Sequence, residues 1–322
     1  MPADEPIDAV YSWVDGADPS FRRALSASGQ QPDWDSAVPC RFRDNGELLY
    51  SLRSLEMHAP WIRKVYLVTN GQVPPWLDLS CERIEVVPHA AIFLDPGHLP
   101  TFNTRAIELS LHRIPGLSER FVYFNDDFFL GRPVTREDFL TPTGGQKLRF
   151  DAHDLPADLA HPHPLARSYA WTQHLLDRLH GRKRGRPWPA HAPRLLDRRL
   201  IDQIEALFPE LVRATCSHRF RSGDDFSLTV FYPFHLLESP EHRGRHQGLI
   251  HDRPTSDYVF FMMEDDIATI LEVFALIREL RPRFFCINDD LDEVPPDHPA
   301  LVALRGLLEA LFPVPSRFEK KR

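Results

Sequence analysis

Short apolar runs alternate with segments of helical periodicity along the first 125 residues, and few folds accommodate such a chain. Branched and aromatic residues dominate the runs that we expect to form strands, at residues 7–14, 65–69, 84–87 and 120–124. Between these runs, apolar residues recur at helical spacing over 47–58, before Pro60, and again over 103–113. This order predicts an α/β fold with a mostly parallel sheet flanked by helices.

Polar residues follow several of the expected strands. Asp15, Asn70 and the triplet Asn125-Asp126-Asp127 each lie where a strand ends, and ligands gather at the carboxyl ends of strands in open α/β sheets. A further aromatic run at 283–287 leads into a second triplet, Asn288-Asp289-Asp290. Such oxygen ligands suit Mg²⁺ or Mn²⁺ held against a diphosphate. An Asx turn or helix cap explains one Asp-Asp pair about equally well, but two such strand ends favour a metal site.

The pattern changes after residue 131, and we expect a boundary near residue 145. Residues 1–145 would form the nucleotide-binding α/β portion, and residues 146–322 a second, more helical part that completes the catalytic core. In this second part, periodicity predicts helices over 195–208 and 267–280, and a strand or buried segment over 226–237. The strand at 283–287 is expected to return to the main sheet.

Composition excludes several classes of protein. The 46 acidic and 38 basic residues give a net charge of −8, which opposes a general nucleic-acid-binding surface. Four cysteines without a CxxC pair indicate neither a zinc knuckle nor a redox motif. The acidic, apolar-poor start and the lack of any run of about 18 apolar residues predict a cytoplasmic protein without a transmembrane segment. Walker, GxGxxG and GxSxG motifs are absent from the sequence.

Some basic residues suit an anionic substrate. Arg41, Arg43 and Arg221 could make forked contacts with phosphate oxygens, and His191 or His218 could move a proton near neutral pH. The chain has 16 histidines, so most of them must be bystanders.

Four blocks of sequence resemble the Stealth family of sugar-phosphate transferases. The first block is IDAVYSWVDGADP at 7–19. The second comprises RFRDNGEL at 41–48, YSLRSLE at 50–56, APWIRK at 59–64, VTNGQ at 68–72, LPTFN at 99–103 and FVYFNDD at 121–127. The third comprises PAHAP at 189–193 and HRFRSGDD at 218–225, and the fourth is FFCIND at 284–289. The blocks occur in the family's order, and the segments 145–185 and 295–322 lie outside the resemblance.

The resemblance implies a glycosyltransferase-A-like, nucleotide-binding sheet with an inserted or appended helical lobe, and it implies an activity. Stealth enzymes transfer a hexose 1-phosphate, such as N-acetylglucosamine 1-phosphate, from a UDP-sugar to a glycan hydroxyl and release UMP. They build phosphodiester-linked capsular polysaccharides or exopolysaccharides in microbes, so association with the periphery of a polysaccharide assembly complex is also implied.

The resemblance also implies roles for individual residues. The expected catalytic residues are Asp126, Asp127, His191, Arg221 and Asp289. The expected ligands of Mg²⁺ or Mn²⁺ are Asp126, Asp127 and Asp289. The expected substrate-binding residues are Trp13, Asp15, Arg43, Asn70, Asn103 and Asn125.

Two other functions remain open on the sequence. A conventional metal-dependent glycosyltransferase would use the same acids and donor but would break the bond at sugar C1 and release UDP. A carbohydrate-binding or scaffold protein would turn over no donor, and the two Asn-Asp-Asp strand ends argue against it.

Overall fold

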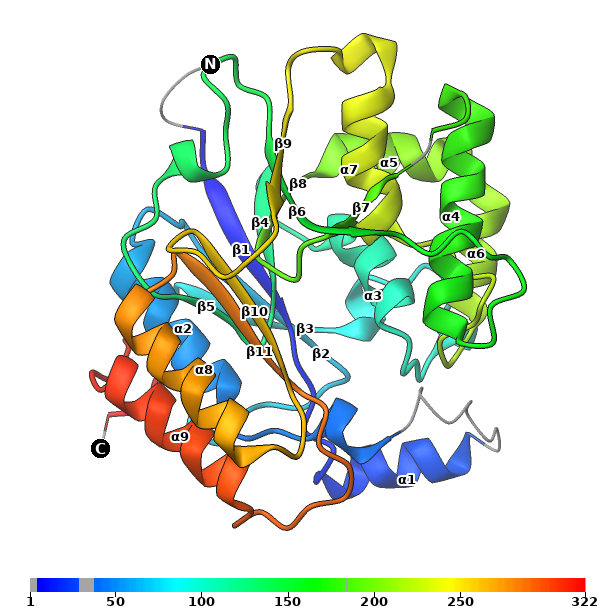
Figure 1. Ribbon diagram of the computed structural model, residues 1–322. Helices are drawn as coiled ribbons and strands as arrows, with labels where there is room; N and C mark the ends of the chain where they lie inside the picture. Colours follow the sequence, from blue (N-terminus) through cyan, green and yellow to red (C-terminus); the bar gives the residue numbers. More distant parts are fainter. Residues whose placement is uncertain (1–4, 29–37, 184, 322) are drawn as a thin grey trace.

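A five-stranded sheet forms the centre of the computed structural model, which describes residues 5–28, 38–183 and 185–321 (Figure 1). The strand order is β3-β2-β1-β4-β8, in which the first four strands run parallel and β8 runs antiparallel to β4. The strands are β1 (Ile7–Ser12), β2 (Val65–Thr69), β3 (Ile84–Pro88), β4 (Arg120–Asn125) and β8 (Arg194–Asp197). The expected α/β class with a mostly parallel sheet is confirmed.

Helices cover both faces of this sheet, as parallel strands require. Alternate residues of β1 face opposite sides: Ala9 and Tyr11 pack with α2 (Glu47–His58), whereas Val10 packs in a separate core. That second core also contains residues of the helices α3 (Thr104–Ser110), α5 (Arg198–Leu207), α6 (Pro209–Ser217) and α7 (Leu228–Glu238). The expected helices at 47–58 and near 103–113 are therefore present.

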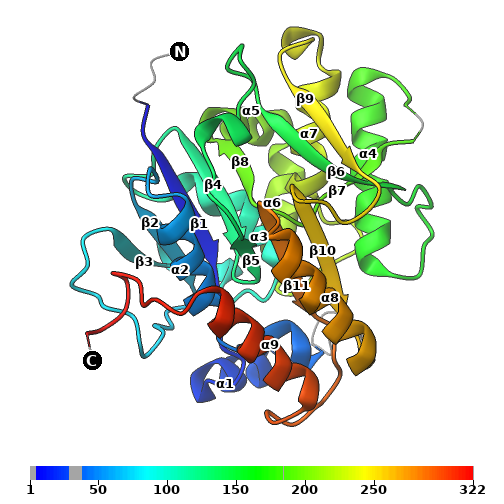
Figure 2. The ribbon, with the colours of Figure 1, turned by 60° about the vertical axis from the view of Figure 1, so that its left-hand side comes forward.

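A second sheet begins where the first one ends. β4 leads through the turn at Asp126 and Asp127 into β5 (Phe128–Leu130), which pairs antiparallel with β11 (Phe284–Asp289). β11 also pairs in parallel with β10 (Tyr258–Met263). The expectation that the strand near 283–287 joins the main sheet is wrong, because β11 lies in this separate sheet of order β10-β11-β5. Figure 2 shows α8 (Ile267–Leu280) and α9 (Pro299–Leu311) beside it.

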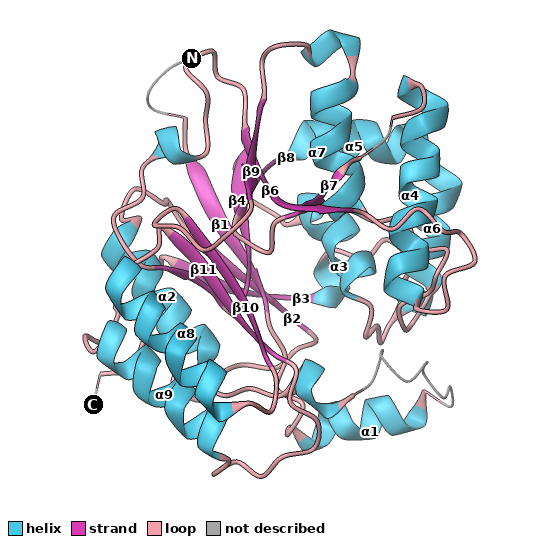
Figure 3. Cartoon of the chain, in the orientation of Figure 1, coloured by secondary structure: helices cyan, strands magenta, loops and turns pink. Residues whose placement is uncertain are grey.

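A third small sheet and the remaining helices complete the described structure (Figure 3). This sheet has the order β7-β6-β9, with β6 antiparallel to β7 and parallel to β9. Its strands are β6 (Lys147–Asp154), β7 (Pro187–Pro189) and β9 (Gln247–His251), and the remaining helices are α1 (Pro19–Ala27) and α4 (Pro164–His180). No helix within the described ranges is both long enough and apolar enough to cross a bilayer.

Two further expectations about secondary structure need correction. The segment 226–237, expected to be a strand or a buried segment, is mostly buried but forms the helix α7 rather than a strand. Because none of its residues is exposed, its sequence lacks the polar face that marks a surface helix. The segment 195–208 begins as β8 and becomes helical only at Arg198, where the side chain of Asp197 caps α5 by accepting from the Leu200 N–H (3.3 Å).

Candidate active site

Asp127 lies in the turn between β4 and β5, at the carboxyl edge of the main sheet. Its Oδ2 atom accepts hydrogen bonds from Nδ2 of Asn288 (3.0 Å) and from Sγ of Cys286 (3.2 Å), both on β11. Its Oδ1 atom is buried and has no hydrogen-bond partner among the described residues. A buried carboxylate oxygen without a partner is unfavourable. This atom is therefore a place where a cation or a substrate group could bind.

His191 approaches Asp127 from the turn between β7 and β8. Its main-chain N–H donates to the hydroxyl of Tyr258 (3.0 Å), and its ring lies edge-on to Phe128, with 5.0 Å between centroids. The Nε2 atom lies 3.5 Å from Nδ2 of Asn125. Burial lowers the pKa of His191, and the charge of Asp127 only partly opposes this effect. The ring is therefore neutral at pH 7 and able to accept a proton.

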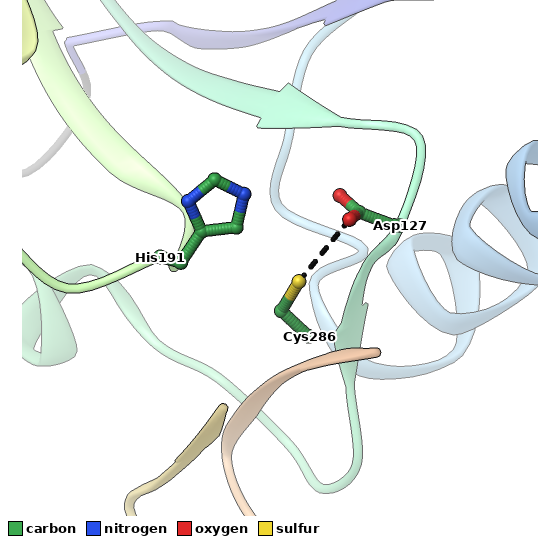
Figure 4. A group of neighbouring side chains, drawn as sticks. All are labelled: Asp127, His191 and Cys286. Atoms are coloured by element: carbon green, nitrogen blue, oxygen red, sulfur yellow. Dashed lines mark hydrogen bonds between the residues drawn. The ribbon is translucent and has the colours of Figure 1, made fainter. Parts of the chain in front are cut away.

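The site contains three residue types that can ligate a metal ion. One ligand atom each of Asp127, His191 and Cys286 lies within 4.8 Å of the other two (Figure 4). Burial and the neighbouring charge of Asp127 raise the pKa of the Cys286 thiol well above its ordinary value, so a thiolate ligand is disfavoured. The partnerless Oδ1 of Asp127 is instead a hard oxygen donor. These residues fit a cation that is held by carboxylate oxygen and completed by substrate phosphates and water.

Further carboxyl groups crowd around this turn, and burial opposes their ionisation. Burial raises the pKa of Asp126 well above its ordinary value, and the charges of Asp127, Glu47 and Asp44 add to the effect. Burial likewise raises the pKa of Glu47 to about 8 and raises that of Asp44. A bound cation would reduce this repulsion, which supports the fit of a cation to the site.

Asp289 pairs with Arg43 and shares the side-chain amide of Asn45 with Glu47. Nη1 of Arg43 donates to both carboxylate oxygens (3.1 and 2.8 Å), and Nδ2 of Asn45 donates to Oδ2 (3.1 Å). The structure thus brings Asp126 and Asp127 together but holds the third expected metal ligand, Asp289, in an ion pair. Side chains alternate along a strand, so the neighbouring Asn288 faces Asp127 and Asp289 faces the other side.

The expected substrate-binding residues after β1 and β2 lie at the same sheet edge. Trp13 is buried in the core, whereas Asn70 is exposed at the end of β2. Gln72 clamps the main chain of Asp15 by accepting from its N–H (3.0 Å) and donating to its C=O (2.8 Å). The Asp15 carboxylate accepts from the N–H of Ala17 (2.8 Å). Asp15 is therefore fixed in position by a residue from the turn after β2.

Arg221 lies on the loop that follows α6. Its Nη2 donates to Oγ1 of Thr104 (3.0 Å), and its positive charge contributes to lowering the pKa of His191. The guanidinium is thus oriented by a residue of α3. The structure brings His191 together with Asn125 and Asp127 at the sheet edge, and the charge of Arg221 acts on this histidine.

Asn103 holds the loop of Arg221 in place and is fully buried. Its Oδ1 caps α3 at the N–H of Arg105 (3.0 Å), and its Nδ2 donates to Oδ2 of the buried Asp225 (2.9 Å). The other carboxylate oxygen of Asp225 lies 2.7 Å from Nδ1 of His218, and this hydrogen bond raises the pKa of His218. The contacts of Asn103 and His218 are thus internal to the protein, and His191 is the histidine at the candidate site.

Sequence reasoning missed several residues that shape the site. Cys286 and Gln72 belong to quoted motifs but received no role, and Tyr258 and Phe260 lie on β10, which was not predicted. Cys286 shares a strand face with Asn288, so period-two alternation was the available signal. It could not be used, because the sequence does not say which face of β11 meets Asp127.

Two bacterial exopolysaccharide phosphotransferases are similar in sequence to nearly the whole chain. The exopolysaccharide phosphotransferase SCO6023 of Streptomyces coelicolor is 39% identical over 98% of this chain and 53% of that protein. The exopolysaccharide phosphotransferase CpsY of Mycobacterium leprae is 34% identical over 98% of this chain and 57% of that protein. The chain thus spans about half the length of these curated relatives. The solved structure of galactosyltransferase LgtC with donor and acceptor sugar analogues aligns with a TM-score of 0.44 and 13% identity, over 96% of this chain and 98% of that one.

All four conserved regions of Stealth proteins match the chain in order. Conserved regions 1, 2, 3 and 4 match residues 5–33, 41–148, 190–238 and 275–322. Every site residue expected from the sequence falls within one of these regions, whereas Tyr258 and Phe260 lie between regions 3 and 4. The expectation that 295–322 lies outside the resemblance is wrong, because region 4 includes it. The matched regions cover most of the sequence and, except for Pro189, every motif that suggested the resemblance, and the chain belongs to the Stealth family.

Proposed function

We propose that this chain transfers a hexose 1-phosphate from a UDP-sugar to a hydroxyl of a glycan acceptor. The acceptor oxygen attacks the phosphorus that carries the sugar, the anhydride bond to the second phosphate breaks, and UMP leaves. The product is a phosphodiester within an exopolysaccharide or capsular polysaccharide. Family membership and the named exopolysaccharide phosphotransferases support this reaction class.

The observation that carries the proposal is the meeting of His191 with Asn125 and Asp127. It joins a motif of conserved region 2 to a motif of conserved region 3, and the ligand atoms of His191 and Asp127 lie within 4.8 Å. His191 is our candidate for the general base that takes the proton of the acceptor hydroxyl, because its lowered pKa keeps it neutral at pH 7.

The acidic turn and Arg221 act on the donor pyrophosphate in this proposal. Asp126 and Asp127 would hold Mg²⁺ or Mn²⁺, which would neutralise charge on the pyrophosphate when bound. Arg221 would contact phosphate oxygens through its planar fork, and Thr104 orients it by accepting a hydrogen bond. Asp289 would act through Arg43, which it holds by an ion pair.

The two parts of the chain supply opposite sides of the site in this proposal. Residues 1–145 would bind the nucleotide sugar through Trp13, Asp15, Asn70 and Asn125 at the strand ends. Residues 146–322 would supply the acceptor side, including His191. Asn103 would act indirectly, through the loop that carries Arg221, because its side-chain contacts are internal.

Product analysis tests the reaction. The chain is incubated with a panel of UDP-sugars, Mg²⁺ and short neutral and acidic oligosaccharides, and released nucleotides are separated by anion-exchange chromatography. We expect UMP, together with a phosphodiester signal in the ³¹P NMR spectrum of the glycan product, and loss of both with EDTA. Release of UDP with a phosphorus-free glycan would identify a conventional glycosyltransferase and would refute the proposal.

A further inference from the structure

β10 presents a row of side chains to the candidate active site. Tyr258, Phe260 and Met262 alternate along this edge strand, and the register with β11 pairs Phe260 with Cys286 and Met262 with Asn288. Cys286 and Asn288 both donate to Asp127, so the row on β10 lies on the same face of the second sheet. Tyr258 also anchors the main chain of His191.

Two members of this row are apolar and exposed. Phe260 is 36% exposed and Met262 is 41% exposed. Their neighbours on the other strand face, Val259 and Met263, are buried in a core shared with α8 and α9. The fold thus buries one face of β10 and leaves an aromatic ring and a thioether in water on the face toward the site. Among the described residues, nothing covers the exposed parts of Phe260 and Met262, which leaves them available to a ligand.

The partly exposed ring of Phe260 lies beside His191, the candidate base. Its ring centroid lies 5.4 Å from that of His191, whereas the ring on the other side, Phe128, is fully buried. A hydroxyl that gives its proton to His191 must come within about 2.6–3.2 Å of a ring nitrogen. The sugar ring that carries this hydroxyl would consequently lie over the exposed surface of Phe260.

We infer that Phe260 and Met262 form the acceptor subsite and that they receive a neutral pyranose ring of the glycan, with its C–H face against Phe260. This inference rests on the proposed function and adds the class of acceptor to it. The strand continues into the exposed acids Glu264, Asp265 and Asp266, which would repel a uronic acid or other anionic sugar.

The variant Phe260→Ala tests the inference, with Phe260→Tyr as the conservative variant and Leu271→Ala as the matched control. Leu271 is an apolar residue of α8 that is 53% exposed, and α8 packs on the opposite face of the second sheet. Kinetics would use the best neutral oligosaccharide acceptor of the wild type. We expect Phe260→Ala to raise the acceptor KM about tenfold, the order expected when one aromatic contact is lost. The donor KM should stay within twofold, and Phe260→Tyr and Leu271→Ala should both resemble the wild type.

Several results would overturn the inference. These are an unchanged acceptor KM in Phe260→Ala, an equal loss in Leu271→Ala, or a preference of the wild type for acidic oligosaccharides. A change in oligomeric state with unchanged acceptor kinetics would instead make the edge of β10 an interface between copies of the chain. If the wild type turns over no donor, the proposed function fails, and saturation-transfer NMR with maltotriose then decides the inference. Transfer to the sugar ring protons that Phe260→Ala abolishes supports it, and equal transfer refutes it.

Discussion

The substitution Asp127→Asn separates the charge of this residue from its part in the fold. The carboxylate accepts two hydrogen bonds at Oδ2, from Asn288 and Cys286, and none at Oδ1 among the described residues. An asparagine can place its amide oxygen at the Oδ2 position and keep both bonds. Its NH₂ group then occupies the Oδ1 position, where it can bind neither a cation nor a proton.

The expected effects on stability and activity differ widely. Each retained bond changes from one with a charged acceptor, about 1.5–3 kcal/mol, to a neutral one, about 0.5–1.5 kcal/mol. Removing the repulsion between Asp127 and Asp126 offsets part of this loss, so we expect a net change of about 1 kcal/mol, or a few degrees in Tm. The turnover number should fall at least about 100-fold, which corresponds to about 2.7 kcal/mol of transition-state stabilisation.

The assay is steady-state release of UMP, with Tm measured by calorimetry on the same samples. Asp8→Asn is the matched control, because Asp8 is a buried carboxylate near the opposite end of the same sheet and is held by Arg63 at 2.6 and 2.8 Å. It should lower Tm and leave kcat near the wild-type value. If Asp127→Asn keeps kcat within a few-fold of wild type at an unchanged Tm, the residue has no part in catalysis.

Three further substitutions test other parts of the structure. Burial lowers the pKa of His58 to about 4, and neither ring nitrogen has a partner among the described residues. As pH falls from about 6.5 to 4, His58 is therefore protonated in the unfolded chain before it is protonated in the folded chain, which lowers stability. Hence His58→Phe should raise Tm, and more at pH 5 than at pH 7, which differential scanning fluorimetry can measure. Asp225→Asn should destabilise the fold by about 3 kcal/mol in urea titrations, since it disrupts a buried charged network with Asn103; a loss below about 1 kcal/mol would contradict this. Arg221→Lys should lower kcat by about one to three orders of magnitude at unchanged Tm. Near-normal kinetics in this variant would show that Arg221 does not contact the donor phosphates.

The sequence predicts the existence of the main elements better than it predicts their partners. β1, β2 and β4 are short, mostly apolar runs that alternate with helices along the chain, which indicates a parallel sheet. The run that forms β11 is equally clear as a strand, but it joins β5 rather than the main sheet. β5 has only three residues, too few to show alternation, so the second sheet could not be recognised from the sequence.

Because the sequence predicts strands better than their pairing, it also predicts only some of the residues that meet at the candidate site. Strand ends at one edge of a parallel sheet converge whatever the rest of the chain does, so Asp15, Asn70, Asn125 and the acidic turn were predictable. Asp289 is the last residue of a strand in another sheet, and the direction of its side chain depends on which face of that strand meets Asp127. Its ion pair with Arg43, 246 residues away in the sequence, could not be foreseen from local pattern.

The turn at Asp126 and Asp127 connects the five-stranded sheet to the second sheet. This position brings the side chains of both sheets to the carboxylate of Asp127. β4 brings the turn to the carboxyl edge of the parallel sheet, and the antiparallel pairing of β5 with β11 brings Asn288 against it from 161 residues away. β10 then continues that sheet to Phe260 beside His191. A change in the pairing of β5 would therefore move the acids relative to both the base and the acceptor subsite. Although β5 has only three residues, it aligns the donor side of the proposed site with the acceptor side.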